Sequence, residues 1–171
     1  TGGNWTIGEQ IRSTPLRYLY KPSKDSRSPD AWYSGIGNLD VHYSSGPHNR
    51  MFYFLSQGAS STVGNDAYSS YLPAGMTGIG NDKAARIAYR ALSTYENPNT
   101  NYAGARTAYI SAATDLYGAG SAEVTAVQNA FAAFIVGSGG GGGGGGNLIQ
   151  NPGFESGAAN WTATAGVITN S

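Results

Sequence analysis

Apolar residues recur every three or four positions through the middle of the chain, between residues 42 and 136. This is the period of an amphipathic helix. Four such stretches begin near Ser44–Pro47, near Asn81 or Asp82, near Tyr102, and at Ser121. Gly58, Pro98 and Gly118 end the first three, because Gly favours the turn after a helix and Pro cannot continue one. The pattern therefore predicts four helices that share one small core.

Each helix is expected to bury one side. The first is apolar almost all round from Arg50 to Leu55, which indicates a central, buried helix. The buried stripes predicted for the others are Ile87, Ala88, Ala91, Leu92 and Tyr95; Ala103, Arg106, Ile110, Ala113 and Leu116; and Val124, Val127, Phe131, Phe134 and Ile135. Ser121 opens the last helix with a capping sequence, Ser-Ala-Glu-Val.

The two ends of the chain differ from this helical section. Residues 1 to about 40 are rich in turn formers and predict irregular structure. Residues 137–146 are nearly all Gly, which predicts a flexible linker. Residues 147–171 look like the start of a β domain that is too short to form a sandwich. We therefore expect a mainly α domain over 1–136, a linker over 137–146, and an incomplete β tail over 147–171.

Composition excludes several partners and chemistries. The formal net charge is zero and only 12% of residues are charged, so there is no basic surplus to bind nucleic acid or an anionic membrane. Cysteine is absent, which excludes disulfides, a thiolate nucleophile and Cys-bound metals. No apolar run is long enough to span a bilayer. The low-charge composition, rich in Gly, Ser, Asn and Tyr, is typical of exported proteins and predicts a secreted, extracellular location.

Candidate chemistry is sparse in the chain. The two histidines, His42 and His48, are six residues apart and do not form the helical i, i+4 pair of a zinc site. Asp40 lies two residues before His42 and could orient and charge its imidazole. A purely structural histidine remains an alternative. The glycines at 75–80 lack the order of a phosphate-binding loop and instead predict a turn before the second helix.

The segment from Asp40 to Leu55 reads DVHYSSGPHNRMFYFL. It resembles the histidine helix of thermolysin-like zinc endopeptidases, whose pattern is roughly V-H-x-N/S-S-G-x-x-N-x-A-F/Y-Y-L. Further blocks follow the order of that family: Trp5–Glu9, Leu16–Pro22, Gly78–Lys83 with Tyr89–Leu92, Ser111–Gly118, and Glu123–Phe131. The resemblance covers residues 3 to 136 and implies the helical C-terminal lobe of such an enzyme, closest in pattern to its elastase-like branch.

The resemblance also implies roles for individual residues. His42 matches the histidine that donates a hydrogen bond to the tetrahedral intermediate, opposite the zinc, and Asp40 matches its carboxylate partner. Arg17 matches the arginine that binds the substrate carbonyl beyond the scissile bond. The walls of the pocket that favours bulky apolar residues after the scissile bond are matched by Ile7, Ile11 and Leu16.

The metal sites implied by the resemblance lie mostly outside this chain. In the family, the HExxH helix and the third zinc ligand precede the region that matches Asn4, so no zinc ligand is expected here. Calcium is implied at Asn4, Thr6 and Glu9, which offer oxygen ligands. The expected partners are peptide substrates and the missing N-terminal catalytic half, without which the chain would be inactive. The alternative is a non-catalytic helical binding domain on a peptidase-derived scaffold.

The tail carries a separate resemblance. Residues 147–157 read NLIQNPGFESG and are followed by Trp161. This is similar to the opening of jelly-roll carbohydrate-binding modules, and it implies a polysaccharide as a further partner.

Overall fold

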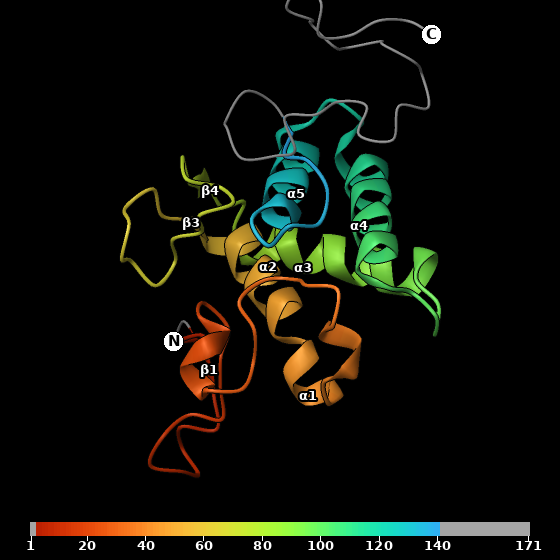
Figure 1. The fold of residues 1–171 in the computed structure, drawn as a ribbon. Coiled ribbons are helices and arrows are strands. Elements are labelled where there is room, and N and C mark those ends of the chain that lie inside the picture. The colour runs from red at the N-terminus through yellow and green to blue at the C-terminus, as the bar shows by residue number, and fades with distance from the viewer. Residues whose placement is uncertain (1–2, 141–171) are drawn as a thin grey trace, which may run out of the picture.

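The structure, a computed structural model, describes residues 3–140 and is mainly helical, as predicted (Figure 1). Its α-helices are α1 (Val41–Ser44), α2 (Gly46–Gln57), α3 (Asn81–Arg90), α4 (Tyr102–Tyr117) and α5 (Ala122–Ala132). Short 3-10 turns form η1 (Pro22–Asp25) and η2 (Ile36–Asn38), and a π turn forms η3 (Ala91–Tyr95). Two antiparallel two-stranded sheets pair β1 (Thr6–Ile7) with β2 (Arg17–Tyr18), and β3 (Gly58–Ala59) with β4 (Met76–Thr77).

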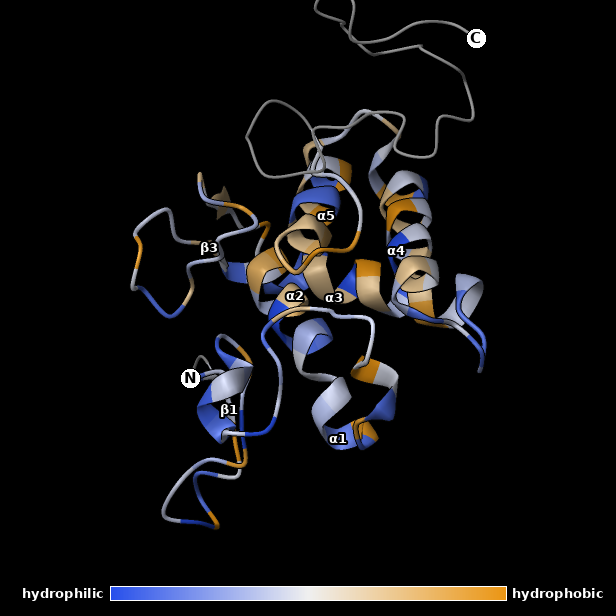
Figure 2. Cartoon of the chain, in the orientation of Figure 1, coloured by the Kyte–Doolittle hydropathy of each residue, from blue (hydrophilic) through white to orange (hydrophobic). Residues whose placement is uncertain are grey.

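Helix α2 lies at the centre of the fold, in contact with α3 and α5. Its Met51, Phe54 and Leu55 are fully buried. In Figure 2, apolar colour appears on α2 and on parts of α4 and α5, whereas the N-terminal segment is mostly polar. Burying a side chain of this size stabilises the fold by about 1.5–3 kcal/mol. The central, buried first helix predicted from the pattern is confirmed.

Side-chain caps start two of the predicted helices, α4 and α5, whereas α2 and α3 begin without one. The Asn101 side chain accepts a hydrogen bond from the Gly104 amide at 2.9 Å and begins α4. Ser121 accepts one from the Val124 amide at 3.2 Å and begins α5. Such caps satisfy amides that have no partner within the helix.

A π turn changes which residues the second predicted helix buries. Regular α-helix ends at Arg90, and the Glu96 amide then bonds the Ala91 carbonyl at 3.0 Å. Because a π turn takes more residues per revolution, the positions after Ala91 rotate away from the core. Leu92 and Tyr95 are consequently 66% and 39% exposed, so their predicted burial is wrong.

Helix α4 buries a different face from the one predicted. Its buried residues are Ala105, Ala108, Tyr109, Ala112 and Ala113. Four of these are alanines, which let α4 pack closely against α5, and the Tyr109 ring lies 5.4 Å from that of Phe131 on α5. Of the predicted stripe, Ala103 and Leu116 are exposed. The apolar spacing did not reveal that other residues, mostly alanines, form the contact with α5.

The chain turns before Ile135, which the pattern placed on the buried stripe of the last helix. Helix α5 ends at Ala132, and the Val136 amide bonds back to the Phe131 carbonyl at 3.0 Å. Ile135 has a positive φ of 74° and is 44% exposed. The other four predicted residues of that stripe, Val124, Val127, Phe131 and Phe134, are buried.

The segment between α2 and α3 forms a loop rather than a helix, and it returns across the end of α2. There the Ile79 amide bonds the Leu55 carbonyl at 2.8 Å, and the Gly80 amide bonds the Ser56 carbonyl at 3.0 Å. A Cβ atom at Gly78 would overlap the carbonyl oxygen of Ser56, so this close approach of two backbones requires glycine. The predicted glycine turn therefore connects the loop to the start of α3.

The first residues of the predicted linker lie against the helices. Arg106 of α4 donates to the Ser138 carbonyl at 2.6 Å, and Asn129 of α5 accepts from the Gly140 amide at 3.0 Å. The remaining predicted linker residues, 141–146, and the predicted β tail, 147–171, fall outside the described residues.

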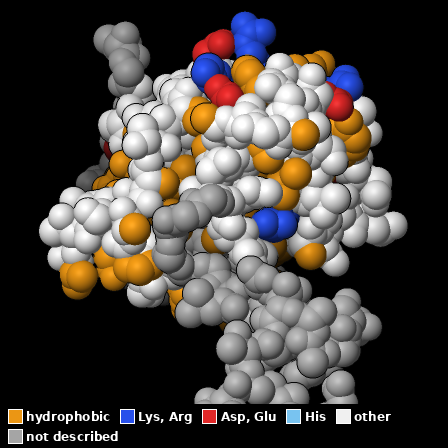
Figure 3. All heavy atoms as spheres, turned by 90° about the horizontal axis from the view of Figure 1, so that it is seen from above, with side chains coloured by type: hydrophobic (Ala, Val, Ile, Leu, Met, Phe, Trp, Pro, Cys, Tyr) orange, Lys and Arg blue, Asp and Glu red, His pale blue; other side chains and the backbone are white. Residues whose placement is uncertain are grey.

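The surface carries few charges. On the face seen from above in Figure 3, charged side chains gather mainly at one edge, where both signs occur together, and uncharged groups cover most of the remainder. Within residues 3–140, no helix is both long and apolar enough to cross a membrane.

One buried arginine connects the helices to the irregular segments. Arg50 of α2 is 3% exposed and lies over the Phe54 ring at 4.9 Å. Its guanidinium donates to four backbone carbonyls, those of Tyr20, Asp30, Asp66 and Tyr68, at 3.2, 3.4, 3.3 and 2.7 Å. Two of these belong to the N-terminal segment and two to the loop between β3 and β4. A single cation therefore fixes both segments against α2.

Replacing this arginine should destabilise the fold strongly. Arg50→Met leaves several buried carbonyls without a donor, each of which costs about 1–3 kcal/mol, so we expect a loss of about 3 kcal/mol or more in the free energy of unfolding. Arg50→Lys should also destabilise, because one ammonium group cannot reproduce the guanidinium fork. Urea denaturation measures both variants. Arg86→Met, at an exposed arginine of α3, is the control and should leave the midpoint unchanged.

Candidate functional site

The hairpin of β1 and β2 positions Arg17. Ile7 pairs with Arg17 across the hairpin, and the Leu16 amide bonds the Ile7 carbonyl at 2.6 Å. The hairpin is attached to the core through Trp5, whose ring lies 5.3 Å from that of Tyr53 on α2. Arg17 is thus held by local strand pairing on a segment that itself packs against the central helix.

Asp40 and His42 form a local pair at the start of α1. Asp40 is the N-cap of this helix and accepts the His42 amide at 2.9 Å. The same carboxylate oxygen lies 2.6 Å from Nδ1 of the His42 ring. The His42 amide above all, and also its ring, hold the pKa of Asp40 below its ordinary value. The side chains of His42 and Asp40 are 74% and 60% exposed, and Nε2 of His42 makes no hydrogen bond within residues 3–140.

Arg17 meets this pair although it lies far away in the sequence. Its Nε donates to the His42 carbonyl at 3.1 Å and its Nη1 to the Leu16 carbonyl at 2.6 Å. Three predicted site residues, Asp40, His42 and Arg17, therefore come together. This arrangement presents an oriented imidazole whose backbone carbonyl is bound by a cation, with the second ring nitrogen open to a partner outside the chain.

Two residues that the sequence did not single out complete the cluster. The Arg17 guanidinium lies 5.0 Å from the centre of the Tyr43 ring and 3.5 Å from a carboxylate oxygen of Asp25. Tyr43 directly follows His42, so its place in the same motif was a usable signal. Asp25 lies in the turn after β2, and nothing in the local sequence indicates that it approaches Arg17.

The three apolar residues expected to form a pocket differ in their surroundings. Ile7 is 53% and Ile11 is 80% exposed, whereas Leu16 is half-buried and lies against Gly8. Leu16 and Arg17 line a cleft of about 440 Å³, whose other walls are mainly polar or cationic. Within the described part of the chain, these three residues alone do not enclose an apolar pocket.

The residues expected to bind calcium do lie together. The Thr6 hydroxyl donates to the Asn4 side-chain oxygen at 2.8 Å. Hydrogen bonds from its own backbone, and then from the Asn4 and Thr6 side chains, lower the pKa of Glu9. Calcium requires six to eight oxygen ligands and commonly several carboxylates. Asn4, Thr6 and Glu9 offer one carboxylate, so they fit only part of a calcium shell.

A zinc site cannot be built from the described residues. Across residues 3–140, there is no cluster of three or more His, Asp, Glu or Cys side chains that could hold a metal ion.

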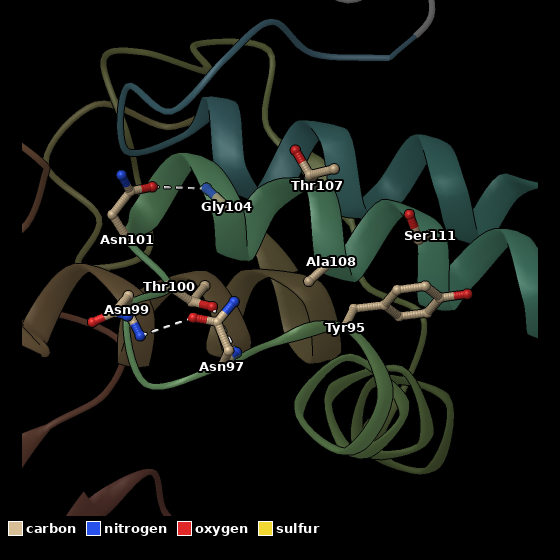
Figure 4. A pocket seen from close by; sticks show the side chains of 9 residues that line it. All are labelled: Tyr95, Asn97, Asn99, Thr100, Asn101, Gly104, Thr107, Ala108 and Ser111. Atoms are coloured by element: carbon tan, nitrogen blue, oxygen red, sulfur yellow. Dashed lines mark hydrogen bonds between the residues drawn. The ribbon is translucent and has the colours of Figure 1, made fainter.

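A second hollow, of about 380 Å³, lies between α4 and the turn that precedes it (Figure 4). Its polar groups largely bond one another: the Asn97 side chain accepts from the Asn99 amide at 2.9 Å, and Thr100 accepts from the Asn97 amide at 2.8 Å. The Asn101 side chain caps α4, as the dashed line to Gly104 shows. These contacts build a turn and leave no reactive arrangement.

The second histidine belongs to the interior. The His48 ring lies 5.4 Å from that of Tyr109 and 6.3 Å from that of Phe131. Its Nε2 atom is buried without a hydrogen-bond partner among the described residues. Burial lowers the pKa of His48 below its ordinary value of 6.5. The two histidines thus divide into an exposed one paired with a carboxylate and a buried one kept neutral.

Comparison with known proteins identifies the family of this chain. Residues 1–136 match the family described as thermolysin metallopeptidase, alpha-helical domain. The chain belongs to this family.

Among its relatives, a transglutaminase-activating metalloprotease of Streptomyces mobaraensis is 48% identical over 142 residues, covering 79% of this chain and 19% of that protein. A bacillolysin of Bacillus caldolyticus and a thermolysin of Alicyclobacillus acidocaldarius subsp. acidocaldarius are each 39% identical over 140 residues, covering 76% of this chain and 24% and 23% of theirs. The chain thus spans about a fifth to a quarter of the length of these relatives.

The buried histidine predicts how stability depends on pH. At pH 7 His48 is mostly neutral in both states. As the pH falls below 6.5, the unfolded chain takes up a proton before the folded chain does, so stability is lost on acidification. His48→Leu should remove this loss, and between pH 7 and pH 5 it should therefore lose less stability than the parent, by on the order of 1 kcal/mol.

Urea denaturation of both proteins at the two pH values measures this difference. Burial raises the pKa of Glu96, which acts in the opposite direction, but that contribution is common to both proteins and cancels. Equal losses in the two proteins would contradict the assignment of His48 as a buried neutral group.

Proposed function

We propose that this domain is the substrate-binding and transition-state-stabilising lobe of a zinc endopeptidase. The observation that carries the proposal is the convergence of Asp40, His42 and Arg17, which come from two segments of the chain. Membership of the thermolysin metallopeptidase family supports it. The names of the relatives, which are metalloproteases, support it too.

His42 is proposed to stabilise the oxyanion that forms when the peptide carbonyl becomes tetrahedral. Asp40 bonds both the amide and the ring of His42, so it sets the direction of the imidazole. The opposite ring nitrogen, Nε2, would donate to the substrate oxygen when the ring is protonated. The spacing of Asp40 and His42 also favours the elastase-like branch of the family.

Arg17 is proposed to bind the substrate carbonyl that follows the scissile bond. Its guanidinium is already oriented by the Leu16 and His42 carbonyls, and further donors of its fork remain available. The exposed apolar side chains of Ile7 and Ile11, together with Leu16, support a preference for a bulky apolar residue after the scissile bond. Protein and peptide substrates would thus be cleaved on the amino side of such residues.

The metal of the reaction is proposed to come from outside these residues, in the N-terminal catalytic half of the whole protein. Zinc bound there would polarise the peptide carbonyl and activate a water molecule. Calcium is proposed to bind Asn4, Thr6 and Glu9 only together with ligands from that half.

The assignments of domain and location are also proposals. The family match ends at residue 136, which supports a boundary between the domain and the glycine-rich segment 137–146. We propose that residues 147–171 begin a carbohydrate-binding module and that the protein is secreted. The low proportion of charged residues supports secretion.

A second candidate function is a non-catalytic binding domain on the same scaffold. The high exposure of the His42 and Asp40 side chains favours it, because water competes for the hydrogen bond between them. The next two experiments separate the two candidates.

The 171-residue chain alone should not hydrolyse protein substrates. Without a zinc site among its described residues, it lacks the group that activates water. Incubation with casein and stoichiometric zinc should release no peptides. Hydrolysis that a chelator abolishes would contradict the proposed division between the two halves.

His42→Ala, made in the whole protein that contains this domain, should lower kcat by about 10²–10³. The hydrogen bond it removes forms only in the transition state, so KM should change much less. Asp40→Asn should act in the same direction but more weakly, because it loosens the orientation of the ring. Steady-state kinetics on a peptide with a bulky apolar residue after the scissile bond measure these effects.

Tyr89→Ala is the matched control, since Tyr89 is also exposed but lies on α3. It should leave kcat unchanged. The melting temperature of His42→Ala should stay near that of the parent, because the His42 side chain is exposed. An unchanged kcat in His42→Ala would favour the non-catalytic binding domain instead.

A further inference from the structure

A cationic groove extends from Arg17. The cleft of about 440 Å³ is lined by Arg12 and Arg17 from the N-terminal segment, by Lys24 and Arg27 around the turn η1, and by Tyr43 of α1. Asp25 is its one acidic lining residue. Four cations around one carboxylate form a local excess of positive charge in a chain whose net charge is zero.

Asp25 is occupied by contacts on its own side of the groove. Its side chain is only 6% exposed and accepts hydrogen bonds from the Arg27 amide at 2.8 Å and from the Ser28 amide at 2.7 Å. Burial would raise its pKa, but these bonds, the Ser28 hydroxyl and the Arg17 charge bring the pKa of Asp25 below its ordinary value. Asp25 therefore stays ionised, yet its charge is directed at Arg17 and the turn rather than at the open groove.

Two of the guanidinium groups have no carboxylate partner within residues 3–140. Arg27 donates to the Tyr43 hydroxyl at 2.6 Å and lies 5.4 Å from the centre of that ring, so its contacts are neutral. Arg12 forms no ion pair in the described part of the chain and is exposed. Lys24, by contrast, is paired with Asp66 at 2.5 Å. The unpaired charge of the groove thus comes from Arg12 and Arg27.

The groove adjoins the proposed substrate-contacting residues. Arg17 forms part of both, and Tyr43 directly follows His42. If Arg17 binds the carbonyl after the scissile bond, the leaving part of the peptide continues past Arg17 toward Arg27.

We propose that this groove binds an acidic side chain of the substrate, on the leaving side of the scissile bond and beyond the bulky apolar residue. The inference rests on the proposed function and adds a substrate class to it. A guanidinium offers two parallel N–H donors to a carboxylate, and this geometry fits Asp or Glu better than a neutral amide. Arg27 is preorganised for this role, because its contact with Tyr43 holds the guanidinium at the groove.

The test measures how fast the whole protein that contains this domain cleaves a set of matched peptides. Three fluorogenic peptides differ only at the second and third positions after the scissile bond, which carry Glu, Gln or Lys. At about 50 mM salt, kcat/KM should be up to about fivefold higher for the Glu peptide than for the Gln peptide, because partly exposed ion pairs contribute modestly. The Lys peptide should be the poorest substrate. At about 1 M salt the Glu preference should largely disappear, since screening then acts within a few ångströms.

Variants separate the groove from general effects. Arg27→Gln should bring the ratio of Glu to Gln peptides close to one, whereas Arg27→Lys should retain part of the preference. Arg86→Gln, at an exposed arginine of α3, should leave both the ratio and the basal rate unchanged. Melting temperatures near that of the parent would show that each variant is folded. Equal rates for the Glu and Gln peptides at low salt would overturn the inference while leaving the proposed function intact.

A binding measurement covers the case in which no peptide is cleaved, an outcome that would count against the proposed function. The same peptides, labelled with fluorescein, are titrated with the 171-residue chain and followed by fluorescence anisotropy. Tighter binding of the Glu peptide that Arg27→Gln abolishes supports the groove. Equal binding of the Glu and Gln peptides, or binding to phosphatidylserine vesicles instead of peptides, contradicts it.

Discussion

The buried guanidinium of Arg50 is the contact on which the arrangement of the irregular segments depends. Loops cannot enter a core unless their carbonyls find donors, because each unsatisfied group costs free energy. Arg50 brings several donors to one place, and four carbonyls from two segments converge on it. A charge at 3% exposure is itself costly, and burial lowers the pKa of Arg50. Its stacking on Phe54 and its four carbonyl acceptors offset that cost.

This constraint reaches the candidate site through the N-terminal segment. Arg50 bonds the carbonyls of Tyr20 and Asp30. Strand β2 ends just before Tyr20, and η1 lies between Tyr20 and Asp30. Trp5 adds a second attachment through its contact with Tyr53. The β1–β2 hairpin can then present Arg17 to the His42 carbonyl, because the chain is attached to α2 on both sides of the hairpin, at Trp5 and at Tyr20. The same helix that forms the centre of the core therefore determines where the charged side chains meet.

Features set by neighbouring residues could be predicted from the sequence, and features set by distant contacts could not. The caps at Asn101 and Ser121 and the pairing of Asp40 with His42 involve residues two or three apart. The exposure of Leu92 depends instead on a π turn, and the buried face of α4 depends on how closely alanines let α5 approach. Arg50 gave no local sign of its four acceptors. The contact of Arg17 with His42 was reachable only through a family resemblance, because 25 residues separate them.

The exposure of the site also bears on how its charges would work. In water, a hydrogen-bonded pair as open as Asp40 and His42 is weakened by the high dielectric constant. The same pair acts more strongly on a substrate oxygen once water is excluded, because the Coulomb energy grows as the effective dielectric constant falls. Nothing within residues 3–140 covers Nε2 of His42, so the substrate and the proposed catalytic half would have to provide that shielding. On this reasoning, the donors proposed for this lobe would act most strongly only once they are covered.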